Sequence, residues 1–179
     1  MSAYWNPLPA VSRWSDGTNL AGKWDECNWR NVPGPFYAAA TDTCVTGRLV
    51  APRNVLYDDG WQEFIYRQPT HPAEVSAVME AAWSDPFGGY AVDGDNHWTV
   101  AAVRGWWRDR GRLREWVAAR LAEFADGTPD GSPDNQDTEG GLREFANYVD
   151  GGLDRYLRGY LFWLDTGRAP HTGERLPAL

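Results

Sequence analysis

Residues 93–99 hold the densest grouping of side chains that could do chemistry: two carboxylates and an imidazole lie within five residues. Alternate residues of an extended loop point the same way, so Asp93, Asp95 and His97 could converge on one cation. A calcium loop of the EF-hand type is excluded, because its sixth and twelfth positions lack the required Gly and Glu. The alternative needs no ligand, since Asp and Asn favour turns and acids favour helix starts. The sequence favours this alternative and leaves these three residues as the candidates for any metal site.

Arginine is concentrated between positions 104 and 120. Six arginines and two acids give this segment a net charge of +4 in a chain of −8, so the remainder carries −12. Arg104, Arg108 and Arg112 are four residues apart and share one face of a helix. Arginine forks bind carboxylates and phosphates, so this face could hold an anionic ligand or an acidic partner. The alternative, favoured by the spare acid elsewhere, is neutralisation by the acids of the following loop, 126–141.

Eleven tryptophans imply either an aromatic core or an aromatic-lined surface. Trp98, Trp106 and Trp107 lie in or beside the two charged segments, and indole faces attract cationic or flat aromatic ligands. These three join the charged residues as candidates for ligand or partner binding. Because aromatic side chains dominate burial in any domain, the sequence favours the core for most of the indoles.

The remaining reactive residue types predict no catalytic site. Cys44 has no nearby His or Lys that would lower its pKa, so we expect a buried structural cysteine. Asp58, Asp59 and Glu63 surround a predicted hairpin, whose tip is usually wet and leaves carboxyl pKa values near normal. The chain contains no Gly-x-Ser-x-Gly elbow, no His-Glu-x-x-His pair, no P-loop and no dinucleotide fingerprint. No cofactor is predicted, and whether the protein is an enzyme stays open.

Composition bounds the class of protein. A chain of 179 residues is long enough to bury a real core and predicts a single domain. Its net charge of −8 disfavours nucleic-acid binding. The N-terminus lacks an apolar signal segment, and no stretch approaches the roughly 20 apolar residues of a membrane span. Two cysteines cannot build an iron–sulfur or structural zinc site alone. We therefore expect a soluble cytoplasmic protein with reduced thiols.

The first part of the chain predicts an irregular arm followed by strands. Prolines and tryptophans crowd residues 1–35, which forbids a regular helix or a central strand there. Residues 36–67 are β-compatible, with one strand at 45–50 and a hairpin pairing 55–57 with 63–67. Asp59-Gly60 between the hairpin strands supplies the positive φ angles of a tight turn.

Helices follow over residues 71–165. A helix begins at Pro72 and stops at Ser84, and residues 87–90 form a loop. Thr99 can cap a long helix that runs to about Phe124. The loop 126–141 is acidic and polar and is expected to be mobile, and the last helix spans 142–165 with a possible kink or break at Gly151-Gly152. Strands first and helices second predict an α+β fold with a small antiparallel sheet packed on about three helices.

A family resemblance rests on three segments: residues 5–9 (WNPLP), residues 34–37 (GPFY) and residues 93–99. In these segments the chain resembles a family of small, tryptophan-rich actinobacterial proteins without an established activity, some of which are labelled ferredoxins. The resemblance covers most of the chain. The label conflicts with the residues, because a ferredoxin needs four thiolates per cluster and this chain has two cysteines.

Two functions from different classes fit these features. The first is an acidic binding protein, of the immunity or inhibitor type, that masks a partner protein. High negative charge speeds the capture of a basic partner, and Trp, Tyr and Arg are the usual interface anchors. The second is a small-molecule-binding protein or enzyme with a tryptophan-lined pocket closed by residues 93–99.

Overall fold

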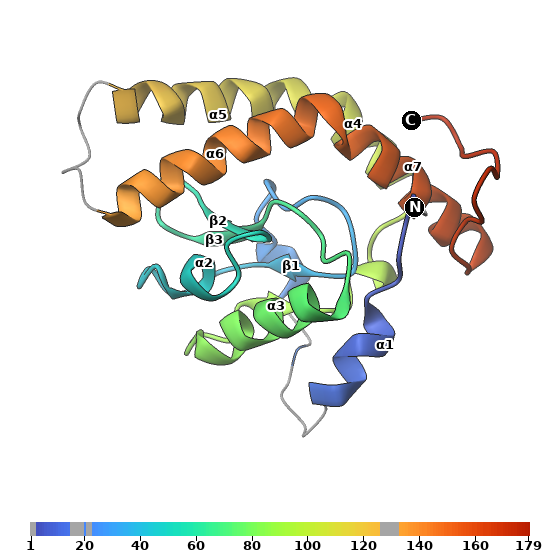
Figure 1. Cartoon of the computed structure of the whole chain (residues 1–179), viewed down its shortest axis with the longest axis horizontal. Coiled ribbons are helices and arrows are strands. Elements are labelled where there is room, and N and C mark those ends of the chain that lie inside the picture. The colour runs from blue at the N-terminus through green and yellow to red at the C-terminus, as the bar shows by residue number, and fades with distance from the viewer. Residues whose placement is uncertain (1–2, 15–19, 21–22, 126–132) are drawn as a thin grey trace.

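The computed structural model describes residues 3–14, 20, 23–125 and 133–179, and these form three layers. Figure 1 shows helices α5 (Arg110–Ala125) and α6 (Pro133–Gly151) side by side over a central layer of short strands, with α3 (Pro72–Ser84) beneath. Each of the two sheets is an antiparallel pair of strands. The predicted α+β class with a small antiparallel sheet is therefore confirmed.

The predicted hairpin is present as β2 (Val55–Tyr57) and β3 (Glu63–Ile65). Val55 lies opposite Ile65, and Leu56 lies opposite Phe64. The Leu56 and Phe64 side chains join the core under α6, whereas Val55 and Ile65 join the core over α3. Alternate residues of a strand point to opposite faces, so this hairpin separates two apolar cores and is buried on both sides.

The hairpin turn is built differently from the prediction. The Asp58 carboxylate accepts hydrogen bonds from the backbone N–H groups of Gly60, at 2.8 Å, and Gln62, at 3.0 Å. The residue with a positive φ is Trp61, at 61°, and not Gly60. A side-chain acceptor thus organises the turn, and Asp58 is buried rather than exposed at a wet tip.

A second strand pair corrects the predicted loop around Tyr90. Strand β4 (Tyr90–Ala91) pairs with β1 (Tyr37–Ala38), more than 50 residues earlier in the chain. The backbone N–H of Ala39 donates to the Gly89 carbonyl at 2.8 Å, and a Cβ at Gly89 would lie only 2.5 Å from the Ala40 carbonyl oxygen. Glycine therefore permits this close approach.

The predicted strand at 45–50 is wrong, because residues Thr46–Val50 form the short helix α2. Val45 adopts a left-handed conformation, with φ 63°, which interrupts an extended chain. The N–H of Gly47 donates to Glu63 Oε1 at 2.7 Å, and a Cβ there would collide with the Glu63 carboxylate and the Tyr90 hydroxyl. This tertiary contact overrides the local β propensity.

The arm and the helices depart from prediction at three places. Leu8–Val11 forms a single helical turn, α1, because proline is tolerated at the first helical positions. The long helix is divided into α4 (Val100–Arg108) and α5 at Asp109. Helix α6 begins at Pro133, inside the predicted loop 126–141, whose residues 126–132 lie outside the described chain. The break predicted at Gly151-Gly152 is present, and α7 (Leu153–Thr166) follows it.

The indoles do not fill the core, so that prediction is wrong. All eleven tryptophan positions are described, and none is buried: ten are half-buried, and Trp83 is 66% exposed. Tyrosine, phenylalanine and leucine fill the interior instead. An indole carries an N–H that needs a partner, which favours the rim of a core over its centre.

The cysteines also differ from expectation. Cys27 and Cys44 are both free thiols, and Cys44 is exposed, whereas a buried residue was predicted. Cys44 lies in the loop that leads into α2, where its side chain faces outward. Burial raises the pKa of the Cys27 thiol to about 11, against a smaller opposing effect of the Asn31 amide, so that thiol is a poor nucleophile.

Among the described residues, the helices fall short of the length and apolar character that crossing a membrane requires.

Candidate functional site

The junction between α4 and α5 is the place where the arginine-rich segment changes direction. Thr99 caps α4 as predicted, since its Oγ1 accepts a hydrogen bond from the N–H of Ala102 at 3.1 Å. At the other end, the N–H of Asp109 donates to Gly105 and the N–H of Arg112 donates to the Asp109 carbonyl. One residue thus links two helices, and the side chains around it point into a common concavity.

That concavity is a cleft of about 440 Å³. The Trp106 indole N–H donates to the Trp29 backbone carbonyl at 3.2 Å, which joins α4 to the N-terminal arm at the cleft wall. A cleft of this size can hold a small ligand or one side chain of a partner. The lining residues are Trp29, Trp106, Arg108, Asp109, Arg110, Gly111, Arg112, Leu113 and Glu115.

Two arginines of the cleft are held by aromatic rings. The Arg112 guanidinium lies 3.8 Å from the centre of the Trp29 ring, and that of Arg110 lies 4.0 Å from the centre of the Trp107 ring. Arg110 also donates one hydrogen bond to the Trp107 carbonyl at 2.9 Å. Over the described ranges, Arg108, Arg110 and Arg112 make no ion pair. A stacked guanidinium keeps in-plane N–H groups available for a carboxylate or phosphate.

A third arginine, Arg30, lies behind the cleft wall. Its guanidinium is 4.6 Å from the Trp29 ring and 4.5 Å from the Trp116 ring, and it pairs with Asp58 and Asp59. The pKa of Arg30 is lowered, first by burial and then by the neighbouring positive charges of Arg112 and Arg120, although the two aspartates oppose this shift. Arg30 thus brings a second guanidinium to the Trp29 ring, and its charge is paired within the chain.

Acids moderate the positive charge of the cleft. Asp109 and Glu115 line the cleft, are exposed, and make no ion pair with its arginines in the part of the chain that the structure describes. Their presence brings the charge of the lining to +1. The acids of the 126–141 loop that were expected to neutralise the arginine stripe do not reach it where described: Asp137 pairs with Arg48, and Glu139 pairs with Arg143.

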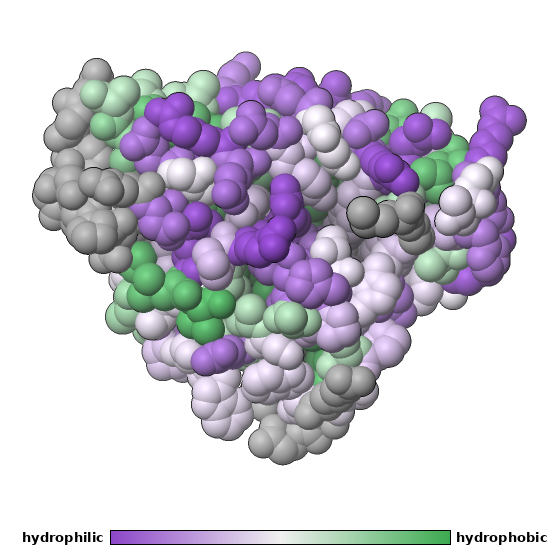
Figure 2. All heavy atoms as spheres, in the orientation of Figure 1, coloured by the Kyte–Doolittle hydropathy of each residue, from purple (hydrophilic) through white to green (hydrophobic). Residues whose placement is uncertain are grey.

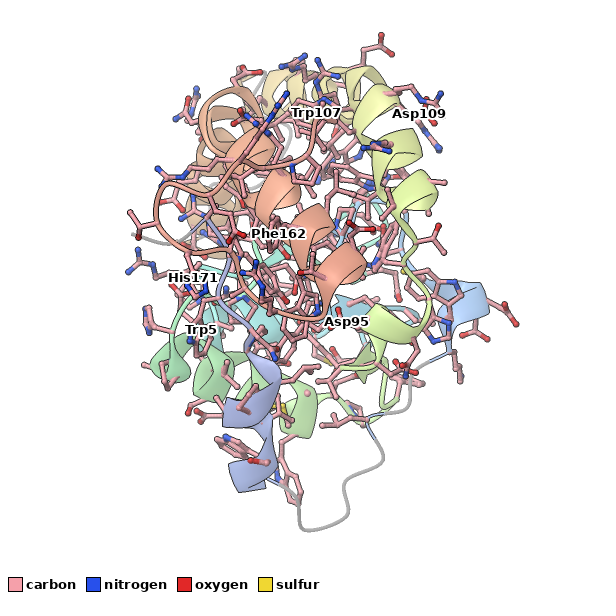
Figure 3. All side chains as sticks on the ribbon, turned by 90° about the vertical axis from the view of Figure 1, so that its right-hand side faces the viewer. Trp5, Asp95, Trp107, Asp109, Phe162 and His171 are labelled. Carbon is pink, nitrogen blue, oxygen red and sulfur yellow. The ribbon has the colours of Figure 1, made fainter. Side chains whose placement is uncertain are left out.

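The arginine face predicted from an unbroken helix is only partly assembled. Arg108 and Arg112 line the cleft, but Arg104 donates to the Ala178 carbonyl of the C-terminal tail at 3.1 and 3.0 Å. Trp106 lines the cleft. Trp107 is not part of the lining, but its ring stacks on the guanidinium of Arg110, which is. In Figure 3, Trp107 and Asp109 lie at the C-terminal end of α4, far from Asp95.

The cleft also contains residues that the sequence did not single out. Arg110 and Glu115 belong to the same charged segment, and the clustering of charge there could have identified them. Trp29 lies 77 residues before Trp106, and no local pattern connects the two.

Residues 93–99 form a separate cluster in which the predicted side chains diverge. Asp95 accepts hydrogen bonds from the Tyr160 hydroxyl at 2.8 Å and from the Trp163 indole at 2.9 Å, so it faces α7 (Figure 3). His97 Nε2 lies 3.2 Å from Asp93. Asp93 and Asp95 thus bind different partners and do not converge. Within the described ranges, no group of three His, Cys, Asp or Glu side chains is placed to hold a metal ion.

Aromatic rings surround the imidazole of His97. The Trp24 ring stacks on it with centroids 4.5 Å apart, while the Tyr37 and Trp98 rings meet Trp24 edge-on. Burial, followed by the Asp93 carboxylate, raises the pKa of the Tyr37 hydroxyl well above its ordinary value. The cleft at the α4–α5 junction has no lining residue from 93–99. This cluster joins the arm to the domain through contacts within the chain.

A carboxyl group with a raised pKa lies elsewhere, at Glu63. Burial raises its pKa to about 7, against hydrogen bonds from the Tyr90 hydroxyl at 2.5 Å and the Gly47 N–H. The negative charges of Asp42 and Asp85 add to the shift. The expectation of an ordinary pKa at this hairpin is therefore wrong for Glu63, which is 1% exposed.

Comparison of the chain with family models, curated proteins and solved structures gave no match.

Proposed function

We propose that this protein is a binding protein whose recognition site is the cleft at the α4–α5 junction, and that the cleft binds a small polycarboxylate or phosphate ligand. One observation carries the proposal: the Arg112 guanidinium is stacked on Trp29 and lacks an acidic partner among the described residues. An arginine in that state is oriented in advance and keeps its hydrogen-bond donors for a ligand.

The overall charge supports a small anion over an acidic protein. The chain carries −8, so a large acidic partner would be repelled at long range. A small anion that enters the cleft experiences mainly the nearby guanidinium groups, because charges beyond about 8–10 Å are screened at physiological salt.

The test is calorimetric titration of the full chain with citrate, pyrophosphate, phosphate and acetate at low salt. We expect at least one polyanion to bind, and Arg108→Gln and Arg112→Gln each to weaken that binding about tenfold, equivalent to about 1.4 kcal/mol. Arg143→Gln is the matched control, because Arg143 is exposed on α6 and already pairs with Glu139.

The acids of the cleft supply a second arm of the test. Asp109→Asn and Glu115→Gln remove negative charge without removing a donor, so each should tighten polyanion binding a few-fold, and added salt should reduce the gain. Absence of binding by every anion tested, or equal weakening by Arg143→Gln, would contradict the proposal.

A second candidate function, masking of a partner protein, is supported by a different surface. Leu49 of α2, Trp83 near the end of α3 and Phe87 in the turn that follows α3 are each at least 66% exposed. Figure 2 shows hydrophobic side chains gathered over α2. Exposed apolar groups of this size are typical of interfaces. Triple replacement by serine should abolish any stable partner complex recovered from the host, while citrate binding at the cleft stays unchanged.

A further inference from the structure

A second cavity lies between α6 and the ends of the hairpin strands. Its volume is about 600 Å³, within the range of small-molecule sites. Helix α6 lines one wall with residues three and four apart, which share a face of the helix. Figure 2 shows hydrophilic side chains gathered on the face below the middle of α6. The lining residues are Arg53, Arg67, Glu144, Asn147, Tyr148 and Gly151.

The positive side of this cavity is formed by Arg67, which makes no ion pair in the described part of the chain, and by Arg53, whose Nε pairs with Glu74. The Arg67 guanidinium lies 4.5 Å from the centre of the Tyr148 ring, and its buried Nε has no hydrogen-bond partner. The Asn54 amide donates to the Arg67 carbonyl at 3.0 Å, which fixes the backbone beneath it. Arg53 is largely exposed and makes only a 3.5 Å contact with Glu74. Both guanidinium groups therefore retain donors for a carboxylate.

The negative side is Glu144. Its Oε2 lies 3.2 Å from the Tyr66 hydroxyl, whose single proton it shares with the Pro52 carbonyl at 3.1 Å. Burial, and then the charge of Glu144, raises the pKa of Tyr66 to about 12, so Tyr66 stays a neutral donor. Across the described chain, no ion pair joins Glu144 to either arginine, although all three line one cavity. The opposite charges stand apart and leave room for a ligand between them.

We propose that this cavity binds a free α-amino acid, with the ligand carboxylate on Arg67 and Arg53 and its ammonium group on Glu144. A simple anion would leave Glu144 without a partner, and a simple cation would leave the two arginines without one. A zwitterion satisfies both sides and fills the separation between them. Asn147, one turn of α6 from Glu144, offers an amide that can donate or accept a further hydrogen bond.

The experiment is calorimetric titration of the full chain with the set of free L-amino acids, followed by the N-acetyl and the C-terminal amide derivatives of the one that binds most tightly. We expect each derivative to bind at least tenfold more weakly than the parent, because each lacks one of the two charges. Binding of the N-acetyl form as tight as the parent would overturn the proposal, and so would the failure of every free amino acid to bind at about 10 mM, which lies above even a millimolar Kd.

Two variants assign the charges to their protein partners. Glu144→Gln should weaken binding of the parent amino acid tenfold but should not weaken binding of the N-acetyl form. Arg67→Gln should weaken binding of both but should not weaken binding of the amide form. Arg143→Gln, next to Glu144 on α6 but paired with Glu139, should change none of these affinities. Thermal melting checks the fold of each variant, and Arg67→Lys keeps the charge if Arg67→Gln does not fold. A Glu144→Gln variant that binds the parent amino acid unchanged would contradict the assignment. The cleft at the α4–α5 junction is not involved, so citrate binding there should persist in every variant.

Discussion

Arg48 and Arg112 are held in opposite ways. Arg48 is buried, and its guanidinium donates to the Asp137 carboxylate at 2.6 and 3.2 Å and to the carbonyls of Pro52 and Val55. Arg112 is exposed and lies on the Trp29 ring. Carboxylates and carbonyls use up the donors of a guanidinium, whereas a ring orients it and uses none. The same residue type therefore joins elements together in one region and can receive a ligand in the other.

Arg30 combines both arrangements. It is stacked between two indoles and also paired with two aspartates, so its two terminal nitrogens are engaged and its role is structural. The difference between Arg48 and Arg112 therefore depends on whether the guanidinium has an acidic partner, and not on whether it contacts an aromatic ring. Replacing Arg48 should mainly lower the stability of the protein, whereas replacing Arg112 should mainly lower its affinity for a ligand.

The largest expected effect is at Arg48. We expect Arg48→Gln to lower the free energy of unfolding by about 3–4 kcal/mol, because it leaves the Val55 carbonyl and the Asp137 carboxylate without the guanidinium donor. Urea denaturation measures the change. Arg143→Gln, which breaks an exposed pair, should change stability by no more than about 0.5 kcal/mol. Equal effects of the two substitutions would remove the distinction between buried and exposed pairs.

Glu63 is a buried acid without an arginine partner, so it should oppose folding when charged. Its pKa is about 7 in the folded chain and 4.5 as an ordinary value. Between these values the folded state holds the proton and the unfolded state does not, so stability should fall as pH rises, by roughly 3 kcal/mol in all. Glu63→Gln should abolish this slope between pH 5 and 8 in urea denaturation. A wild-type stability that rises over this range would contradict the assignment.

Asp58 holds the acidic end of the Arg30 pair. Its oxygens accept four hydrogen bonds, two from the turn and one each from Asn28 and Arg30. Asp58→Asn should cost about 2 kcal/mol in thermal or urea unfolding, since an amide N–H₂ would face donors. Asp59→Asn is the control: Asp59 is 62% exposed, and its loss should cost less than about 1 kcal/mol.

A small effect on stability is expected in the cleft. Arg112→Gln loses one exposed stacking contact, so the free energy of unfolding should change by about 0.5 kcal/mol, while polyanion affinity falls about tenfold. A loss of stability as large as that of Arg48→Gln would mean that Arg112 is structural, and the proposed binding site would fail.

Local patterns predicted the elements that local chemistry determines. The helix start at Pro72, the Thr99 cap and the hairpin of β2 and β3 follow from turn and cap preferences and from the period of apolar residues. The predictions failed where contacts between distant parts of the chain determine the structure. Helix α2 depends on Glu63, and β4 depends on a partner strand more than 50 residues away.

For the candidate site too, the sequence predicted the residues that lie close together in the chain and missed the distant contacts. The arginine run identified Arg108 and Arg112, because their spacing lies within one segment. The sequence could not reveal that Trp29 of the arm would lie beneath Arg112, or that Arg104 would contact the C-terminal tail. The spacing of Asp93, Asp95 and His97 suggested that their side chains converge. Asp95 instead faces α7, because buried Tyr160 and half-buried Trp163 each need a hydrogen-bond acceptor.

The most direct test of the account is an NMR spectrum of the arginine Nε–H groups during a citrate titration. The Arg112 signal is identified by its absence from the Arg112→Gln spectrum, and that of Arg48 by its absence from an Arg48→Lys spectrum. We predict that the Arg112 signal shifts progressively with citrate, whereas the Arg48 signal does not move. An Arg112 signal that stays in place while citrate binds, or an Arg48 signal that moves as far, would contradict the claim that arginines without an acidic partner are the ones free to bind a ligand.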